Sequence, residues 1–306
     1  MAAVTLLEQT KLITNPAEVL VANVFALEYE IMGLLPFEEM SGYHKPYTVV
    51  DTLPTVAPRD FGVDFTADYG KSSTYNVPWK NYGGRLEVDK ALRVGNPKGA
   101  AQQEMMQIQA IAKQWSTHIF EGVGGTSITG IKTFLSSFYP GQIAYAGSTS
   151  GGDLLTMDMM DAAFNLVVKD EKTAIFCSQI VRNRLSYLAR TAYSIINFQP
   201  DQFGNQVLSY NGVPIYCMID GYTSKDLLST TELDHGGGAN TTSSLYIVNF
   251  GEETVSGFSP QAQTLQVEVL NPGTNAWVTR LEMNAGITVV QPRAAAVISS
   301  IKQATA

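Results

Sequence analysis

The stretch from Asn96 to Gly122 constrains the fold of this chain most strongly, because it has the pattern of one long amphipathic helix. Asn96 is a favourable N-cap residue, and Pro97 stands at the first helical position, where its missing N–H costs nothing. Gly122 stands where a left-handed C-cap glycine is expected. Apolar residues recur every three or four positions on one face: Met105, Ile108, Ala112, Trp115 and Ile119.

A helix over residues 97–121 would be ~37 Å long at 1.5 Å per residue, and the usual helix has only ~11–12 residues. Such a helix is a spine that sets the length of whatever packs on it. We expect its apolar face to pack on long strands of the same subunit. We expect the opposite face to meet solvent or a neighbouring molecule; it carries Gln103, Gln107, Gln114 and Glu121.

The region before this helix predicts a long, exposed, two-stranded β-ribbon. Residues 36–84 hold five prolines and many aromatic residues, with only weak alternation of apolar and polar positions. The stretch is much longer than an ordinary connection of ~4–6 residues. Because an isolated ribbon is marginally stable in water, we expect it to lie on another chain. Residues 85–94 then lead as a strand directly into the helix.

The two ends of the chain have simpler patterns. Residues 1–14 read as a short arm, and Asn15-Pro16 opens a helix that ends near Gly33 and Pro36. Its apolar stripe is Leu20, Val24, Leu27 and Ile31. The C-terminal part predicts strands over residues 264–270, 277–283, 287–290 and 294–298, with a turn at 271–273 and a break at Gly286.

The middle of the chain predicts a mixed α/β region. Thr156 is placed to cap a helix, residues 173–177 read as a buried strand, and Ser178 opens a helix with Val181, Leu185 and Leu188 turned inward. Asn211-Gly212, between residues 206–210 and 213–219, is the strongest short hairpin signal in the sequence.

Composition excludes several classes of function. The net charge is −8 and no basic stripe is present, so tight phosphate-driven binding of nucleic acid is not expected. Only 16% of the residues are charged, which fits a surface partly covered by copies of the same chain. Cys177 and Cys217 make no disulfide framework and are expected to be buried, inert thiols. Neither a signal peptide nor a membrane span is predicted.

The search for an active site predicts no catalytic, cofactor-binding or metal-binding residue. The three histidines, His44, His118 and His235, are scattered. His235 begins a His-Gly-Gly-Gly run like the oxyanion loop of some esterases, but Thr149 stands where the matching nucleophile elbow needs serine. Residues 125–130 miss a phosphate loop, because Ile131 replaces its lysine. We therefore expect the chain not to be an enzyme.

The order of these elements resembles the major capsid proteins of tailed bacteriophages, which have the Hong Kong 97-type fold. Local stretches are similar too. The extended loop of that family looks like two stretches here: Leu35-Pro36-Phe37-Glu38-Glu39 with Ser41-Gly42, and Leu53-Pro54 with Arg59. The strand before its spine helix looks like Gly83-Gly84-Arg85 through Val88-Asp89-Lys90. Parts of its axial domain look like residues 173–190 and Val213-Pro214-Ile215.

The resemblance implies an α+β fold with four parts. Residues 1–35 would be an N-arm and residues 36–84 would hold the extended β-hairpin loop. Residues 85–145 and 262–292 would form a peripheral domain around the spine helix 97–121. Residues 146–261 and 293–306 would form a mixed α/β axial domain.

The function implied by the resemblance is structural. The chain would assemble with itself into hexamers and pentamers of an icosahedral shell that encloses double-stranded DNA without sequence-specific binding. It would be made in the cytoplasm of a host bacterium and be part of the virion. Portal, scaffolding and possible decoration proteins are implied partners. No long N-terminal segment of the kind that some members use as a fused scaffold is present, so a separate scaffolding protein or none is expected.

Two alternatives stay open at this point. One, with the same fold, is an encapsulin-like shell of a bacterial compartment, which would enclose an enzyme. The other belongs to a different class: a soluble hydrolase that uses the glycine-rich loop at His235. Some capsid proteins also link a loop lysine to a neighbour's asparagine; Lys45, Lys71 and Lys80 lie in or near the ribbon, but no partner asparagine is identified.

Overall fold

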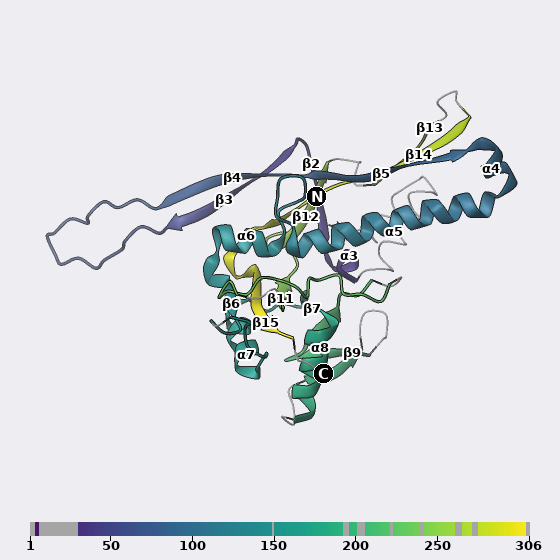
Figure 1. The fold of residues 1–306 in the computed structure, drawn as a ribbon. Coiled ribbons are helices and arrows are strands. Elements are labelled where there is room, and N and C mark those ends of the chain that lie inside the picture. Colours follow the sequence, from purple (N-terminus) through teal and green to yellow (C-terminus); the bar gives the residue numbers. More distant parts are fainter. Residues whose placement is uncertain are drawn as a thin grey trace.

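A computed structural model of the chain describes residues 4–5, 30–148, 150–191, 196–200, 206–220, 223–238, 241–260, 265–270 and 275–303. Three regions are visible in Figure 1. A long hairpin projects to one side, an elongated sheet with the spine helix along it extends to the other, and a rounded α/β body lies below their junction.

The spine helix is present as predicted and forms α5 (Pro97–Glu121). Asn96 caps it, because its Oδ1 atom accepts a hydrogen bond of 3.0 Å from the N–H of Gly99. A short helix, α4 (Lys90–Gly95), turns the chain into it. On the predicted apolar face Met105 is half-buried, and the other four residues are buried: Ile108, Ala112, Trp115 and Ile119.

The prediction of a left-handed C-cap at Gly122 is wrong. Gly122 has φ −59° and ψ 131°, which is an extended conformation open to any residue. Glycine is needed there for a different reason: a Cβ atom would lie 2.3 Å from the carbonyl oxygen of Ile128. The chain returns so closely that the N–H of Gly130 donates to the carbonyl of Gly122 at 2.8 Å.

The elongated sheet is built around one long strand, β14 (Ala276–Val289). The two predicted strands at 277–283 and 287–290 are therefore one, because Gly286 continues the strand instead of breaking it. A Cβ atom on Gly286 would lie 2.2 Å from the ring of Phe258, so glycine admits that ring against the sheet. Strands β5 (Lys80–Asp89) and β13 (Leu265–Leu270) flank one half of β14, and β12 (Val255–Pro260), β2 (Pro36–Met40) and β1 (Val4–Thr5) continue the sheet from its other half.

The spine helix packs on this sheet, as expected. Tyr82 on β5 meets Trp115 on α5 edge to face, with ring centroids 5.3 Å apart. Gly84 lets the helix approach, since a Cβ atom there would lie 2.1 Å from the side-chain nitrogen of Gln107. The expected outward face of α5 is thus only half right. Gln103 and Gln114 are exposed, whereas Gln107 is turned against β5 and Glu121 is half-buried.

The body is a mixed sheet between two layers. One of its faces meets the end of the spine helix: Phe120 lies 5.1 Å from Phe176 and 4.8 Å from Tyr246 between ring centroids. The other face is covered by α7 (Met157–Leu166) and α8 (Gln179–Thr191). In spatial order the strands are β6 (Ile143–Tyr145), β15 (Ala295–Lys302), β11 (Thr242–Asn249), β7 (Thr173–Cys177), β10 (Val213–Cys217), β9 (Gln206–Tyr210) and β8 (Ile196–Pro200).

Local signals in the body are confirmed. Asn211 and Gly212 both have positive φ, 50° and 78°, as the two-residue hairpin between β9 and β10 requires. The Thr156 hydroxyl accepts a hydrogen bond from the N–H of Met159 and caps α7. Val181 and Leu185 are buried beneath α8 and Leu188 is half-buried. Cys177 is buried as predicted, but Cys217 is only half-buried.

The N-terminal prediction lies mostly outside the described residues. Only the end of the expected helix is described, as α3 (Glu30–Leu34), with Ile31 buried. Strand β2 follows at once and pairs in parallel with β12, so the first residues assigned to the extended loop belong to the elongated sheet. The division into four parts remains a prediction.

Candidate assembly surface

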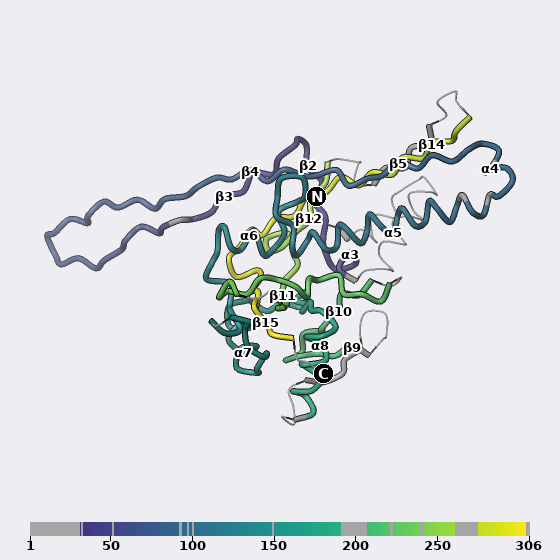
Figure 2. The backbone as a smooth tube through the Cα atoms, in the orientation of Figure 1, coloured from purple at the N-terminus to yellow at the C-terminus, as the bar shows by residue number. Residues whose placement is uncertain are grey.

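The projecting hairpin is made of β3 (His44–Thr52) and β4 (Lys71–Pro78). They pair antiparallel from His44 opposite Pro78 to Thr52 opposite Lys71. Residues 53–70 continue beyond the paired strands as an open loop, which we call the tip (Figure 2). At its other end β4 is separated from β5 by Trp79 alone, so a single run of chain joins the tip to the elongated sheet.

The base of the hairpin is fixed to the rest of the subunit by aromatic packing. Tyr47 on β3 lies against Phe134 and Phe138 of α6 (Ile131–Phe138), with ring centroids 5.3 and 5.8 Å apart, and Tyr75 on β4 lies 4.6 Å from Phe138. Aromatic pairs of this kind contribute ~0.5–1.5 kcal/mol beyond their area burial. The base is therefore part of the core, and only the outer part of the hairpin is free.

A second set of contacts sets the direction of the hairpin where it leaves the sheet. The Lys45 ammonium lies 2.6 Å from the Glu38 carboxylate on β2 and is only 18% exposed. Tyr43 and Trp79 meet edge to face, and the Trp79 indole N–H donates to the carbonyl of Gly42 at 3.1 Å. Lys45, one of the three candidate cross-linking lysines, is thus already engaged within its own subunit.

The tip exposes an unusual amount of apolar surface. Phe61 is fully exposed, and Val56 and Tyr69 are 88% and 83% exposed. The same short segment also exposes Leu53, Val63 and Phe65. Large apolar side chains gathered in one exposed segment are typical of interaction sites in soluble proteins. Burying one such side chain contributes ~1.5–3 kcal/mol. Burial of the tip against another surface is therefore strongly favourable.

The tip has internal structure of its own. The Arg59 guanidinium donates to the carbonyl of Val63 at 2.6 Å and lies 4.9 Å from the ring centroid of Phe65. The Asp68 carboxylate accepts from the N–H groups of Thr55, at 2.8 Å, and Tyr69, at 2.9 Å, which lowers the pKa of that carboxyl. These contacts order the loop that carries the apolar side chains, and a loop that is already ordered loses less entropy on binding.

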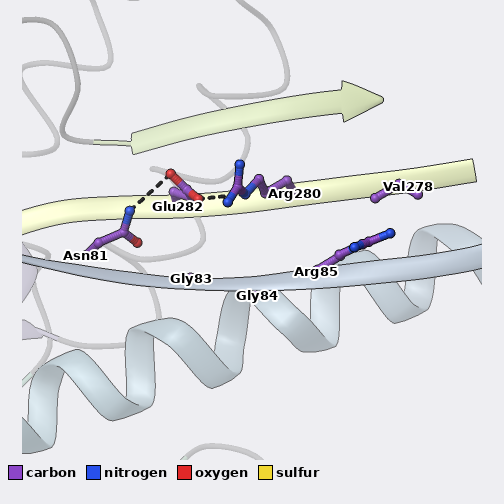
Figure 3. Close-up of a pocket in the computed structure, with 7 residues that line it drawn as sticks. All are labelled: Asn81, Gly83, Gly84, Arg85, Val278, Arg280 and Glu282. Carbon is purple, nitrogen blue, oxygen red and sulfur yellow. Dashed lines mark hydrogen bonds and ion pairs between the residues drawn. The ribbon is translucent and has the colours of Figure 1, made fainter. Parts of the chain in front are cut away.

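The open face of the elongated sheet, opposite the spine helix, is the second exposed surface (Figure 3). A hollow of about 620 Å³ lies there, floored by Gly83 and Gly84 on β5. Its charged rim is paired within the subunit. The Glu282 carboxylate lies 2.7 Å from Arg280 and accepts from the side-chain amide of Asn81 at 3.0 Å, and Arg85 pairs with Glu87. The charged groups that line the hollow are thus paired with one another, and we assign the hollow no ligand.

The glycine-rich loop at His235 does not have the geometry of an oxyanion hole. The Asp234 carboxylate accepts hydrogen bonds from the N–H groups of Gly238, at 2.8 Å, and Gly151. An oxyanion would need such N–H groups free and would be repelled by that carboxylate. The His235 ring stacks on Tyr145 with centroids 3.8 Å apart, and the backbone N–H of His235 donates to the Ser300 hydroxyl at 2.9 Å. The loop therefore ties β15 and residues 150–153 together.

Other chemistry is equally sparse in the described part of the chain. The Tyr82 hydroxyl lies 2.9 Å from the Nδ1 atom of His118, so this ring is held in place by a neighbouring side chain. Within the described ranges no three His, Cys, Asp or Glu side chains gather as metal ligands. No helix in those ranges is long and apolar enough to cross a membrane.

Sequence reasoning found the ribbon but missed the exposed apolar side chains at its tip. It also missed that Gly83 and Gly84 allow close packing, because a Cβ atom there would clash with the backbone of Leu281 or the side chain of Gln107. A signal for the tip was present: six large apolar residues lie among prolines and aspartates between 53 and 69, with no strand pattern that would bury them. No comparable signal exists for the glycines, because what they make room for is distant in sequence.

Comparison with known proteins gives matches in structure only. No family model and no curated protein sequence matches this chain. The holo-SrpI encapsulin complex of Synechococcus elongatus matches with a TM-score of 0.67 at 13% identity, over 90% of this chain and 88% of that chain. The capsid of cyanophage A-1(L) matches with a TM-score of 0.62 at 14% identity, over 90% and 93%. A chain of Mycobacterium phage Bobi matches with a TM-score of 0.58 at 13% identity, over 92% and 91%.

Proposed function

We propose that this chain, whose fold is the Hong Kong 97 type of tailed-phage capsids, is the subunit of a closed icosahedral shell. The observation that carries the proposal is the hairpin tip. It is apolar, exposed and internally ordered in a single subunit, so it needs a partner to cover it. In a shell of identical subunits each tip lies on the next subunit, and heterologous contacts of this kind close into rings.

The finer proposal is a phage head made of hexamers and pentamers that encloses double-stranded DNA, with the protein made in the host cytoplasm and carried in the virion. Phage and gene-transfer-agent capsid particles are prominent among the similar structures, and the sequence motifs resemble the phage family. A net charge of −8 fits a wall that does not grip its contents. Portal, scaffolding and decoration proteins stay as proposed partners.

The compartment shell is the second candidate, and the likeness to an encapsulin supports it. The two readings differ in contents. We expect particles isolated from their natural source to protect double-stranded DNA from nuclease until the shell is opened. Particles that hold a single enzyme and no DNA would favour the compartment shell.

We propose that the chain is not an enzyme, and His235→Ala tests this. The change removes a ring that stacks on Tyr145, which costs ~0.5–1.5 kcal/mol, and touches no surface in the assembly proposal. We expect the variant to form shells of normal size, as seen by negative-stain electron microscopy. An esterase activity of the wild-type protein, measured on p-nitrophenyl esters and lost in the variant, would contradict the proposal; Tyr145→Phe, which keeps the stack, is the matched control.

A further inference from the structure

Two carboxyl groups meet where the spine helix ends against the α/β body. Glu121 is the last residue of α5, and Glu232 lies in the segment that leads to β11. The Glu121 Oε1 atom accepts a hydrogen bond of 2.6 Å from the N–H of Ser229. The Glu232 side chain lies beside the same carboxyl, and its charge is one of the causes that raise the pKa of Glu121. The end of the helix therefore meets the 229–232 segment through two acidic side chains, Glu121 and Glu232.

The groups around this pair come from two further elements, α6 and β11. Lys132 on α6 donates to Glu232 Oε2 at 2.7 Å and to the Ser244 hydroxyl on β11 at 3.1 Å. The Ser244 hydroxyl donates to the same Glu232 oxygen at 2.5 Å. Tyr246 on β11 is buried with a raised pKa, first because of burial and then because of the charges of Glu232 and Glu121. The cluster thus holds two carboxyls, one ammonium and one neutral phenol.

This arrangement cannot easily carry two negative charges. Glu232 is only 10% exposed, and two carboxylates in contact in such a site do not both ionise freely. Lys132 and Ser244 both donate hydrogen bonds to Glu232, whereas no side-chain cation donates to Glu121 among the hydrogen bonds of the described residues. Glu121 stands at the C-terminal end of a helix, where the helix dipole disfavours an anion. Burial, followed by the Glu232 charge, raises the pKa of Glu121 to about 7.

We propose that Glu121 and Glu232 share one proton, and that this proton fastens the end of the spine helix to the 229–232 segment of the body. The protonated Glu121 donates to the Glu232 carboxylate while its other oxygen accepts from Ser229. When the proton leaves, two carboxylates face each other and the segment is pushed away from the helix. This is a property of the single subunit, so it stands or falls independently of the proposed shell.

The sign of the pH dependence follows from the direction of the pKa shift. The pKa of Glu121 is about 7 in the folded chain and 4.5 ordinarily, so the folded chain binds the proton more tightly than the opened one. The fastening is complete at pH 4.5 and below, weakens as the pH rises, and is lost above about pH 7. A shift of this size corresponds to a change on the order of 100-fold in the opening equilibrium.

Hydrogen exchange of the full-length chain tests the fastening. Peptides covering residues 227–234 are compared at pH 5.5 and pH 8.5, after correction for the intrinsic exchange rate at each pH. We expect wild-type protection to fall by at least tenfold at the higher pH. In Glu121→Gln the side-chain amide donates to Glu232 at every pH, so protection should not change. Glu253→Gln, an exposed site, is the matched control and should behave as wild type.

Infrared spectroscopy of the wild-type protein tests the proton directly and needs no variant. We expect a carboxylic-acid carbonyl band at pH 5.5 that disappears by pH 8.5. Where Glu121→Gln folds, the band should be missing from it. No carboxyl that titrates between these pH values, or equal loss of protection in wild type and Glu121→Gln, would overturn the proposal.

Discussion

Replacing residues 53–70 with an Asn-Gly turn is expected to give a folded subunit that no longer forms closed shells. Thr52 and Lys71 are opposite each other in the hairpin, so a two-residue turn joins them without disturbing the strands. The base keeps Tyr47, Tyr75 and their contacts with α6, and circular dichroism should therefore match that of the wild type. Sedimentation velocity should show the shell fraction reduced by more than tenfold.

The apolar side chains are the proposed cause, and a variant that keeps the length of the tip separates them from the backbone. Val56→Ser, Phe61→Ser and Tyr69→Ser together leave the contacts of Arg59 and Asp68 in place. We expect this triple variant to lose most assembly as well, because each exposed side chain contributes ~1.5–3 kcal/mol when buried. Normal shells from the shortened variant would refute the role given to the tip.

Trp115→Ala is expected to damage folding itself. Trp115 is fully buried in the middle of the apolar face of α5 and packs against Tyr82. Truncating a buried tryptophan costs ~3–5 kcal/mol, a large part of the ~5–15 kcal/mol that stabilises a typical domain. We expect the variant to be poorly soluble. The fraction that folds should have a lower midpoint of unfolding in urea than the wild type. Loss of shells should follow from this and not precede it.

Urea unfolding of Trp115→Ala is best measured in the variant with the shortened tip, because unfolding is not coupled to assembly there. Trp115→Phe is the control. The Trp115 Nε1 atom is buried without a hydrogen-bond partner among the described residues, so phenylalanine keeps the ring packing with Tyr82 and removes an unsatisfied donor. It should lose much less stability than alanine does. Equal losses for the two variants would show that the packing argument is wrong.

Prediction from sequence succeeded where the signal was local. Asn96 and Pro97 marked the first turn of the spine helix, residues 173–177 were a buried strand, and Asn211-Gly212 gave a hairpin. The apolar spacing on α5 found the residues that pack on the elongated sheet. The order of such elements was enough to predict the α+β capsid fold, which the structural matches confirm.

Prediction failed where distant residues decide the outcome. Gly122 was interpreted as a helix cap, yet it makes room for the carbonyl of Ile128, where the chain folds back. Gly286 was interpreted as a break between strands, yet it makes room for the ring of Phe258 on a neighbouring strand. Gln107 and Glu121 were placed on the face left for solvent or a neighbouring molecule, because helical spacing does not reveal that they lie against Gly84 and Glu232. The sequence did contain one signal for Glu121: a glutamate at the C-terminal end of a helix is disfavoured by the helix dipole and so needs a specific environment.

The central claim is that the exposed tip of one subunit lies on another subunit of a closed shell. Cryo-electron microscopy of the purified full-length protein tests it most directly. We predict closed particles hundreds of ångströms across, in which residues 53–70 of every subunit are covered by a neighbour. A stable monomer or dimer, or a shell in which the tips project into solvent, would contradict the claim.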